Sequence, residues 1–148
     1  MAFEREFQLS WSQLDANAHA ANTAYLDLAV DCRFLYFASK GFTPADFARH
    51  RIGPVVRRDE VDYFRETRFL ERVSVNLLLA GIAQDDSRFR IVNEIRRGDG
   101  ELAARITTLG GWFDLAARKL TVPPPALADA MRDLERTPDF ETLPSSIR

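Results

Sequence analysis

The chain has 148 residues, of which 46% are hydrophobic and 28% are charged, and its formal net charge is −2. This size and composition are typical of one globular domain with a hydrophobic core. The slightly acidic balance argues against binding to nucleic acid or to an anionic membrane, because both call for a basic protein surface. No apolar run reaches the roughly 18 to 20 residues of a membrane span. The first residues, MAFEREFQ, lack the apolar region of a secretory signal.

Cysteine and histidine are scarce, which limits the metal and disulfide chemistry that we expect. Cys32 is the only cysteine, so we expect neither an intrachain disulfide nor a cysteine-based zinc site. His19 and His50 are the only histidines, too few for a histidine-rich metal site. The sequence therefore predicts a cytoplasmic protein without a bound metal.

The first part of the chain reads as a strand, a loop and a long helix. Apolar residues alternate with polar ones from Phe3 to Trp11, which is the period of a half-buried strand. Residues 12–21 are small or polar and predict a loop. From Asn22 the apolar residues recur at helical spacing on two faces, and Gly41 suits the C-terminal cap. A helix apolar over most of its circumference should be buried by more than one neighbour.

The rest of the chain predicts one short helix, four strands and a terminal helix. Thr43 and Pro44 open the short helix, which should stop near Gly53. Strands are expected over 55–64, 73–83, 89–95 and 102–114, with a hairpin at 97–100. The pair Gly110-Gly111 predicts a bulge or a close backbone approach. Residues 126–136 read as an amphipathic helix, and 137–148 as a loose tail.

This order of elements favours an α+β fold in which a single antiparallel sheet wraps around one hydrophobic helix. We expect one domain over residues 1–136, followed by the tail 137–148.

The polar segment between the first strand and the long helix is the strongest candidate for a functional site. Within it, Asp15 supplies a carboxylate, His19 an imidazole, Asn22 an amide and Tyr25 a phenol. They lie just ahead of or within the first turn of the predicted helix, where free backbone N–H groups and the helix dipole favour negative charge. Such a site can hold an anion or polarise a carbonyl group.

The same segment resembles the hotdog-fold acyl-CoA thioesterases of the 4-hydroxybenzoyl-CoA thioesterase type. Members of that family often carry W-x-D-x-D-x-x-G-H-V-N-N-x-x-Y ahead of the central helix. Here the segment reads WSQLDANAHAANTAY, so that five positions fall in register: Trp11, Asp15, His19, Asn22 and Tyr25. The resemblance in element order extends from about Phe3 to Pro125. It implies the hotdog fold, in which the sheet wraps around the central helix.

The resemblance also implies roles for two residues. Asp15 matches the catalytic carboxylate, which acts as a nucleophile on the thioester carbonyl or as a general base for water. Asn22 matches the position whose backbone N–H points at the thioester oxygen, and a helix N-terminus is a preorganised donor for that charge. The chain departs from the family pattern at Gln13, Ala18 and Ala21, which replace an acidic residue, a glycine and an asparagine. A two-carboxylate mechanism is therefore not expected.

Each candidate also has a purely structural interpretation. Asp15 could cap a turn, and Asn22 could be an ordinary helix N-cap while its backbone N–H faces a ligand. We expect His19 to organise the loop and Tyr25 to pack with a hydrogen-bonded hydroxyl. Trp11 could line an acyl pocket, but we expect it in the core.

Several arginines are candidates for contacts with the phosphates of coenzyme A, because a guanidinium group forms paired hydrogen bonds with phosphate. We favour Arg88 and Arg90 among a set that also includes Arg57, Arg58, Arg96 and Arg97. Arginines on strands are more often solvated outer-face residues, however. The chain has no glycine-rich phosphate loop and no G-x-S-x-G elbow, so nothing indicates ATP, NAD or a serine esterase.

The sequence thus predicts a thioester hydrolase that needs no metal or redox cofactor and acts on an acyl-CoA or acyl-carrier thioester. The resemblance implies a homodimer or homotetramer, with sheets joined edge to edge and sites at the subunit interface. Two alternatives stay open. A hydratase or dehydratase of the same fold would use His19 with an acidic residue, and a non-catalytic protein would only bind acyl-CoA.

Overall fold

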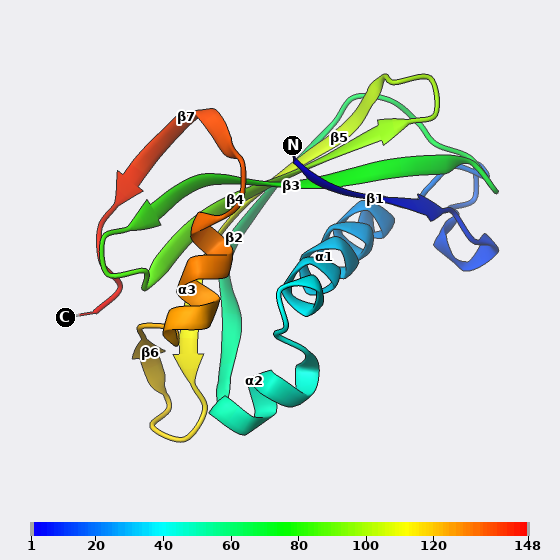
Figure 1. Cartoon of the computed structure of the whole chain (residues 1–148). Coiled ribbons are helices and arrows are strands. Elements are labelled where there is room, and N and C mark those ends of the chain that lie inside the picture. Colours follow the sequence, from blue (N-terminus) through cyan, green and yellow to red (C-terminus); the bar gives the residue numbers. More distant parts are fainter. Residues whose placement is uncertain (1, 148) are drawn as a thin grey trace.

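The computed structural model describes residues 2–147 and shows a curved sheet with a long helix against its concave face (Figure 1). The helices are α1 (Asn22–Ser39), α2 (Pro44–His50), α3 (Pro125–Arg132) and a 3-10 turn, η1 (Trp11–Gln13). The strands are β1 (Phe3–Gln8), β2 (Ile52–Tyr63), β3 (Arg72–Ala83), β4 (Arg88–Arg97), β5 (Leu102–Asp114), β6 (Lys119–Thr121) and β7 (Arg136–Leu143).

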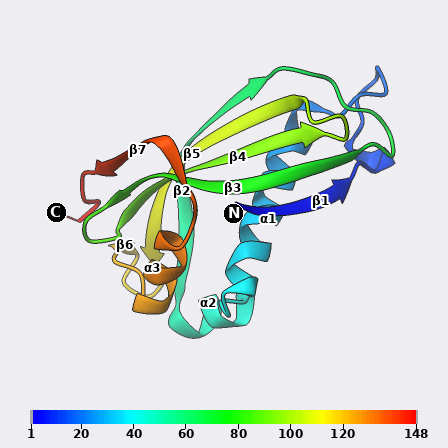
Figure 2. The same ribbon diagram turned by 45° about the horizontal axis from the view of Figure 1, so that its top comes forward.

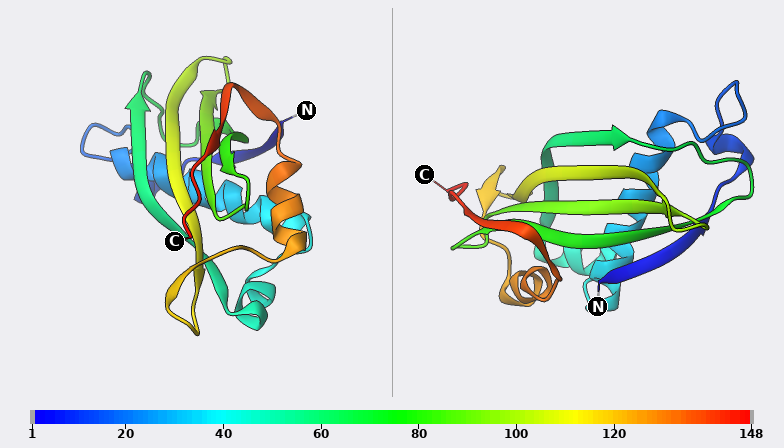
Figure 3. Two further views of the ribbon diagram at one scale, coloured as in Figure 1. Left: turned by 90° about the vertical axis from the view of Figure 1, so that its left-hand side faces the viewer. Right: turned by 90° about the horizontal axis from the view of Figure 1, so that it is seen from above.

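Five of the six strand pairings in the sheet are antiparallel, and the pairing of β7 with β3 is parallel. The strand order is β1-β3-β4-β5-β2, with β6 paired to β5 and β7 paired to β3. Figure 2 shows β1 and β2 at opposite edges, and Figure 3 (right) shows α1 crossing beneath the strands. This arrangement confirms the predicted α+β fold, an antiparallel sheet wrapped around one helix.

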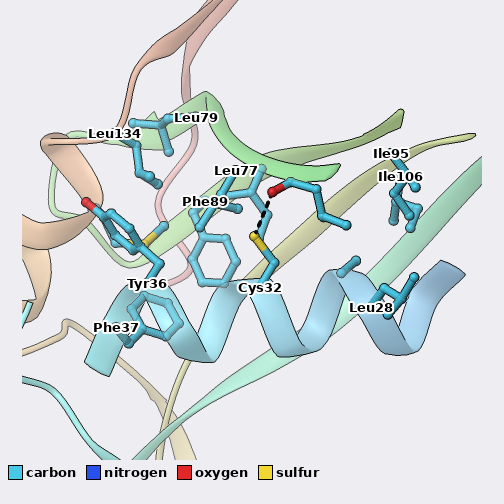
Figure 4. Packing of buried hydrophobic residues seen from close by; sticks show 14 of the residues in the cluster. Leu28, Cys32, Tyr36, Phe37, Leu77, Leu79, Phe89, Ile95, Ile106 and Leu134 are labelled. Carbon is cyan, nitrogen blue, oxygen red and sulfur yellow. Dashed lines mark hydrogen bonds between the residues drawn. The ribbon is translucent and has the colours of Figure 1, made fainter. Parts of the chain in front are cut away.

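The helix α1 begins and ends where the sequence predicts, but the sheet encloses it less completely than expected. Its sheet-facing side chains are buried, including Leu28, Cys32 and Tyr36 (Figure 4). Val30, Phe34 and Leu35 remain 37–45% exposed. A single curved sheet covers one side of a helix, and of the second apolar face of α1 only part is covered by Phe47 of α2 within residues 2–147.

One polar residue of α1 lies in the interior. Arg33 is buried, and its Nε donates to Asn93 Oδ1 at 3.0 Å while Nη2 donates to Thr108 Oγ1 at 2.8 Å. Burial lowers the pKa of this guanidinium, and the nearby carboxylate of Asp59 opposes that effect. The hydrogen bonds of Arg33 to two strands explain how a charged group can lie in the interior.

Cys32 is fully buried, and its thiol donates to the carbonyl of Val75 at 3.5 Å (Figure 4). Burial raises the pKa of this thiol to about 12. Because the thiolate is the reactive form, we expect native protein to show no reaction with a thiol reagent at pH 8. Denatured protein should then show one thiol per chain. Rapid labelling of the native protein would mean that this part of the core opens readily.

The C-terminal segment differs from the prediction. Residues 137–148 were expected to be a loose tail, but β7 runs parallel to β3 through Ala83, paired with Leu143. The reason is that β1 pairs with β3 only as far as Leu77, which leaves the second half of β3 as an open edge. The tail covers that edge. Its sequence gave no strand signal, since it contains Pro138 and few apolar residues.

The Gly110-Gly111 pair marks a close backbone approach, as expected. A Cβ added to Gly110 would lie 2.5 Å from the carbonyl oxygen of Val55, and one on Gly111 would lie 2.9 Å from that of Ser87. The bulge lies nearby on the partner strand, where the β2–β5 register shifts between Val56 and Arg58. None of the helices within residues 2–147 combines the length and apolar character needed to cross a membrane.

Candidate active site

The loop between β1 and α1 is held by backbone hydrogen bonds to the segment that links β2 to β3. Leu9 accepts from Leu70 N and donates to Glu71 O, both at 3.1 Å, and Ala20 N donates to Thr67 O at 2.8 Å. Figure 3 (right) shows the loop at one end of the sheet, beside that link. Hydrogen bonds therefore join the β1–α1 loop to the β2–β3 link, although the two segments lie about fifty residues apart in sequence.

The two carboxylate oxygens of Asp15 have different surroundings: Oδ1 accepts hydrogen bonds within the loop, and Oδ2 does not. Its Oδ1 accepts from the backbone N–H groups of Asn17 at 2.8 Å and His19 at 3.3 Å. Its own N–H donates to His19 O at 2.8 Å. Its Oδ2 accepts no hydrogen bond from residues 2–147, and the residue is exposed. The turn-capping and catalytic interpretations are therefore compatible, since each uses a different oxygen.

Asn22 is the first residue of α1, and the N-cap is Ala21. The alternative interpretation of Asn22 as the helix N-cap is thus wrong, because Ala21 takes the extended cap conformation and has no side-chain acceptor. The Asn22 N–H donates to no acceptor in the described part of the chain. Its carbonyl accepts from the Tyr63 hydroxyl at 3.0 Å, which fixes the first turn. A free N–H donor therefore stands at the start of an 18-residue helix.

His19 is paired with a residue that the sequence did not single out. Its Nε2 lies 2.7 Å from Oε2 of Glu66, and the side chain is 29% exposed. Its backbone N–H and carbonyl both contact Asp15, so that His19 organises the loop as expected. Glu66 could not be inferred locally because it lies in the β2–β3 link, far from His19 in sequence.

Tyr25 and Gln13 support the loop from inside. Tyr25 is buried, donates to the carbonyl of Arg65 at 3.3 Å and lies 3.0 Å from Thr67 Oγ1, which confirms the expected packing role. Burial raises the pKa of its phenol. Gln13 Oε1 accepts from Ser10 N at 2.9 Å, and its carbonyl accepts from Ala21 N at 2.7 Å. In this chain Gln13 therefore links Ser10, the N-cap of η1, to Ala21, the N-cap of α1.

Of the candidate residues, Asp15, His19, Asn22 and Tyr25, but not Gln13, line a cleft of about 670 Å³. Its walls come from the loop, the first turn of α1, the β2–β3 link and the end of β4, with lining residues Asp15, His19, Ala20, Asn22, Tyr25, Tyr63, Phe64, Arg65, Glu66, Arg68 and Arg97. Asp15 and Asn22 thus line one cleft. Among residues 2–147, no three His, Cys, Asp or Glu side chains gather in a way that could hold a metal ion.

The family assignment rests on a sequence match. A family model described as the thioesterase-like superfamily matches residues 9–131, which include the whole cleft and most of the sheet. The chain belongs to the thioesterase-like superfamily. Thioester hydrolysis, the enzyme class that we expected from the Trp11–Tyr25 segment, is the class of this family. A comparison of the sequence with curated proteins finds no match.

Solved structures similar to this thioesterase-family chain establish the fold. A Staphylococcus aureus protein solved in complex with CoA has a TM-score of 0.83 and 15% identity, covering 99% of this chain and 92% of its own. A 1,4-dihydroxy-2-naphthoyl-CoA thioesterase from Synechocystis has a TM-score of 0.80 and 20% identity, covering 90% and 98%. A DHNA-CoA thioesterase from Staphylococcus aureus also has a TM-score of 0.80 and 20% identity, covering 88% and 89%.

The structure separates Arg88 and Arg90 from this cleft within one chain. Both lie at the start of β4, where Arg90 pairs with Glu141 at 2.9 Å and Arg88 donates to Ser146 Oγ at 3.3 Å. Arg97, at the opposite end of β4, lines the cleft instead. Seven positions of a strand span about 23 Å, so Arg90 cannot reach a ligand bound beside Arg97 unless that ligand is long.

Ala18 of this thioesterase-like chain occupies a strained position. Its φ is +61°, in the left-handed region that favours glycine, and the family pattern has glycine there. We therefore expect Ala18→Gly to stabilise the protein by about 1 kcal/mol and to raise Tm by about 2–4 °C. Thermal unfolding measures the effect. A lower Tm would mean that the loop does not hold Ala18 in this conformation.

Proposed function

We propose that this protein is an acyl-CoA thioesterase in which Asp15 and the backbone N–H of Asn22 perform the reaction. The observation that carries the proposal is their shared cleft: Asp15, which has a free carboxylate oxygen, and Asn22, whose N–H starts α1, both line the same cavity. A thioester carbonyl placed between them would meet a donor for its oxygen and a base or nucleophile for its carbon.

The proposed reaction develops negative charge on the carbonyl oxygen. The Asn22 N–H and the dipole of α1 stabilise that charge, an interaction typically worth a factor of about 10² to 10³ in rate. Asp15 removes a proton from the attacking water, or attacks the carbonyl itself and is later released by water. In either case the C–S bond breaks, the acid retains the new C–O bond, and the thiolate leaves and takes up a proton.

Three hydrogen-bond donors hold the reacting centre in place. The hydroxyl of Tyr63 fixes the carbonyl of Asn22, and the N–H groups of Asn17 and His19 fix Oδ1 of Asp15. Both reacting groups are therefore preorganised by hydrogen bonds that do not consume the atoms needed for catalysis. The steps use water and groups of the chain, and call for neither a metal nor a redox cofactor.

A panel of aliphatic and aromatic acyl-CoA thioesters, assayed for free thiol, tests the proposed activity. The buried Cys32 should add no background to a thiol reagent. We expect turnover of at least one thioester, with release of equimolar acid and thiol. Tight binding of acyl-CoA without thiol release from any member of the panel would instead indicate a binding protein.

The ion pair between His19 and Glu66 supports a second candidate function, a hydratase or dehydratase. Histidine next to a carboxylate is an acid–base pair, and both side chains line the cleft. An enoyl-CoA substrate separates the two functions, because hydration removes the conjugated double bond without releasing thiol. Loss of hydration in His19→Ala, with full activity in Asp15→Asn, would favour the hydratase.

We also propose a homodimer, with a homotetramer as the alternative, joined through the free edge of β2. That strand is twelve residues long and, within the described residues 2–147, is paired on one side only, to β5. The exposed apolar side chains of α1, Val30, Phe34 and Leu35, support the same proposal because they need a cover. Light scattering coupled to size exclusion measures the assembly, and a monomer at micromolar concentration would contradict it.

The cytoplasmic location stays a prediction.

A further inference from the structure

An exposed aromatic pair stands next to the cleft. Trp11 is 74% exposed and Phe69 is 42% exposed, and their rings meet edge to face with centroids 5.6 Å apart. The expectation that Trp11 lies in the core is therefore wrong. It begins η1, which follows β1 instead of extending it, and no residue of this turn is buried.

The backbone holds this pair in place. The turn at residues 68–71 is closed by two hydrogen bonds, from Arg68 N to Glu71 Oε2 at 2.9 Å and from Glu71 N to Arg68 O at 3.0 Å. Leu70, within the turn, has a φ of +63°, which costs free energy for a residue with a branched side chain. A turn that keeps this conformation and exposes Phe69 at its tip is suited to contact a ligand.

The cleft wall next to the aromatic pair carries two arginines, Arg65 and Arg68, on either side of Glu66, which pairs with His19. Arg68 precedes Phe69, lines the cleft and forms no ion pair with a carboxylate of residues 2–147. Arg65 lines the same wall, and within residues 2–147 its only ion pair is a long one, 3.9 Å from Glu101. The wall therefore offers guanidinium groups that can bind phosphate.

We propose that Trp11 and Phe69, together with Arg68, bind the adenosine 3′-phosphate 5′-diphosphate part of coenzyme A. The inference rests on the proposed thioesterase function and specifies its substrate as a coenzyme A thioester. Adenine stacks on the exposed indole, and the phosphates meet Arg68 and Arg65. A carrier-protein thioester has the pantetheine arm but no purine, so it would leave the aromatic pair unused.

The position of Trp11 also defines how the ligand lies. Four residues separate Trp11 from Asp15, so their Cα atoms are at most about 14 Å apart. A thioester at Asp15 and an adenine at Trp11 therefore require a bent pantetheine arm. The arm would fold over the cleft, past the guanidinium of Arg68.

The experiment compares one acyl group on coenzyme A and on pantetheine, which lacks the nucleotide. Stacking on an aromatic residue is worth about 10-fold in affinity or more. We expect Trp11→Ala to raise KM for acyl-CoA about 10-fold with kcat unchanged, and to leave KM for acyl-pantetheine unchanged. Trp11→Phe should retain most of the affinity. Leu115→Ala removes another exposed apolar side chain, outside the cleft, and should change neither KM.

Adenosine 3′,5′-bisphosphate gives a second readout that does not depend on turnover. It should quench the fluorescence of exposed Trp11 in the wild-type protein, with weaker binding in Arg68→Gln. An equal rise in KM for both substrates in Trp11→Ala, or no rise for either, would overturn the nucleotide site and leave the thioesterase function standing. Bisphosphate binding without hydrolysis of any thioester would support the nucleotide site and reject the thioesterase function. Preference for an acyl-carrier-protein thioester, unaffected by Trp11→Ala, would overturn the coenzyme A assignment.

Discussion

Replacement of Asp15 by asparagine should lower kcat for thioester hydrolysis by about 10² to 10⁴, the range typical of a lost acid–base group. The substitution removes the charge and the basicity of the side chain while keeping its size. The amide oxygen can still accept from the N–H groups of Asn17 and His19, as Oδ1 does now. The loop should therefore keep its conformation, and Tm should change little.

Asp27→Asn is the matched control for this variant. Asp27 is an exposed aspartate on the first turns of α1 and does not line the cleft. The control makes the same chemical change close to the same helix N-terminus, so a general electrostatic effect on the helix would lower kcat in both variants. We expect Asp27→Asn to keep wild-type kcat. A similar loss in the two variants would remove Asp15 from the reaction.

Gly110→Ala should have the largest effect on stability, a loss of about 3 kcal/mol and a fall in Tm of about 6–12 °C. The new Cβ would lie 2.5 Å from the carbonyl oxygen of Val55 and 2.9 Å from the ring of Phe89. Gly110 lies on β5, paired with β2 on one side and β4 on the other. Neither backbone can move without breaking ladder hydrogen bonds, and so the strain cannot relax cheaply.

Gly53→Ala controls for the general cost of replacing a strand glycine. Gly53 lies near the start of β2, and a Cβ there would meet no atom within 4 Å. We expect a change in the free energy of unfolding of less than about 0.5 kcal/mol. Chemical denaturation of both variants measures the difference. Equal stability of Gly110→Ala and wild-type protein would mean that β2 and β5 are less closely packed at this point.

Local patterns in the sequence were enough to predict the helices in the first third of the chain. The boundaries of α1 followed from the change to helical spacing at Asn22 and from Gly41, which has a φ of +80° after the helix end. Thr43 and Pro44 open α2 as expected, with the Thr43 side chain accepting from Asp46 N. In each case the signal is a property of a few consecutive residues, such as a cap or a period.

What the sequence could not predict depends on contacts between distant segments. Glu66 and Arg68 enter the cleft because the β2–β3 link is hydrogen-bonded to the β1–α1 loop, and no local pattern specifies that. The strand β7 forms only because β3 extends beyond β1. The position of Trp11 could not be predicted from its residue type and the alternating pattern. A tryptophan in such a run was expected in the core, but the chain turns at Ser10 and leaves Trp11 exposed.

The most direct test of the proposed mechanism measures binding and turnover in the same variant. An acyl-CoA that the wild-type protein hydrolyses is titrated into Asp15→Asn by calorimetry, and thiol release is followed in parallel. We expect a Kd close to the wild-type KM and a rate at least about 10²-fold lower. Hydrolysis by Asp15→Asn at the wild-type rate would contradict the account, because the carboxylate would then have no part in the reaction.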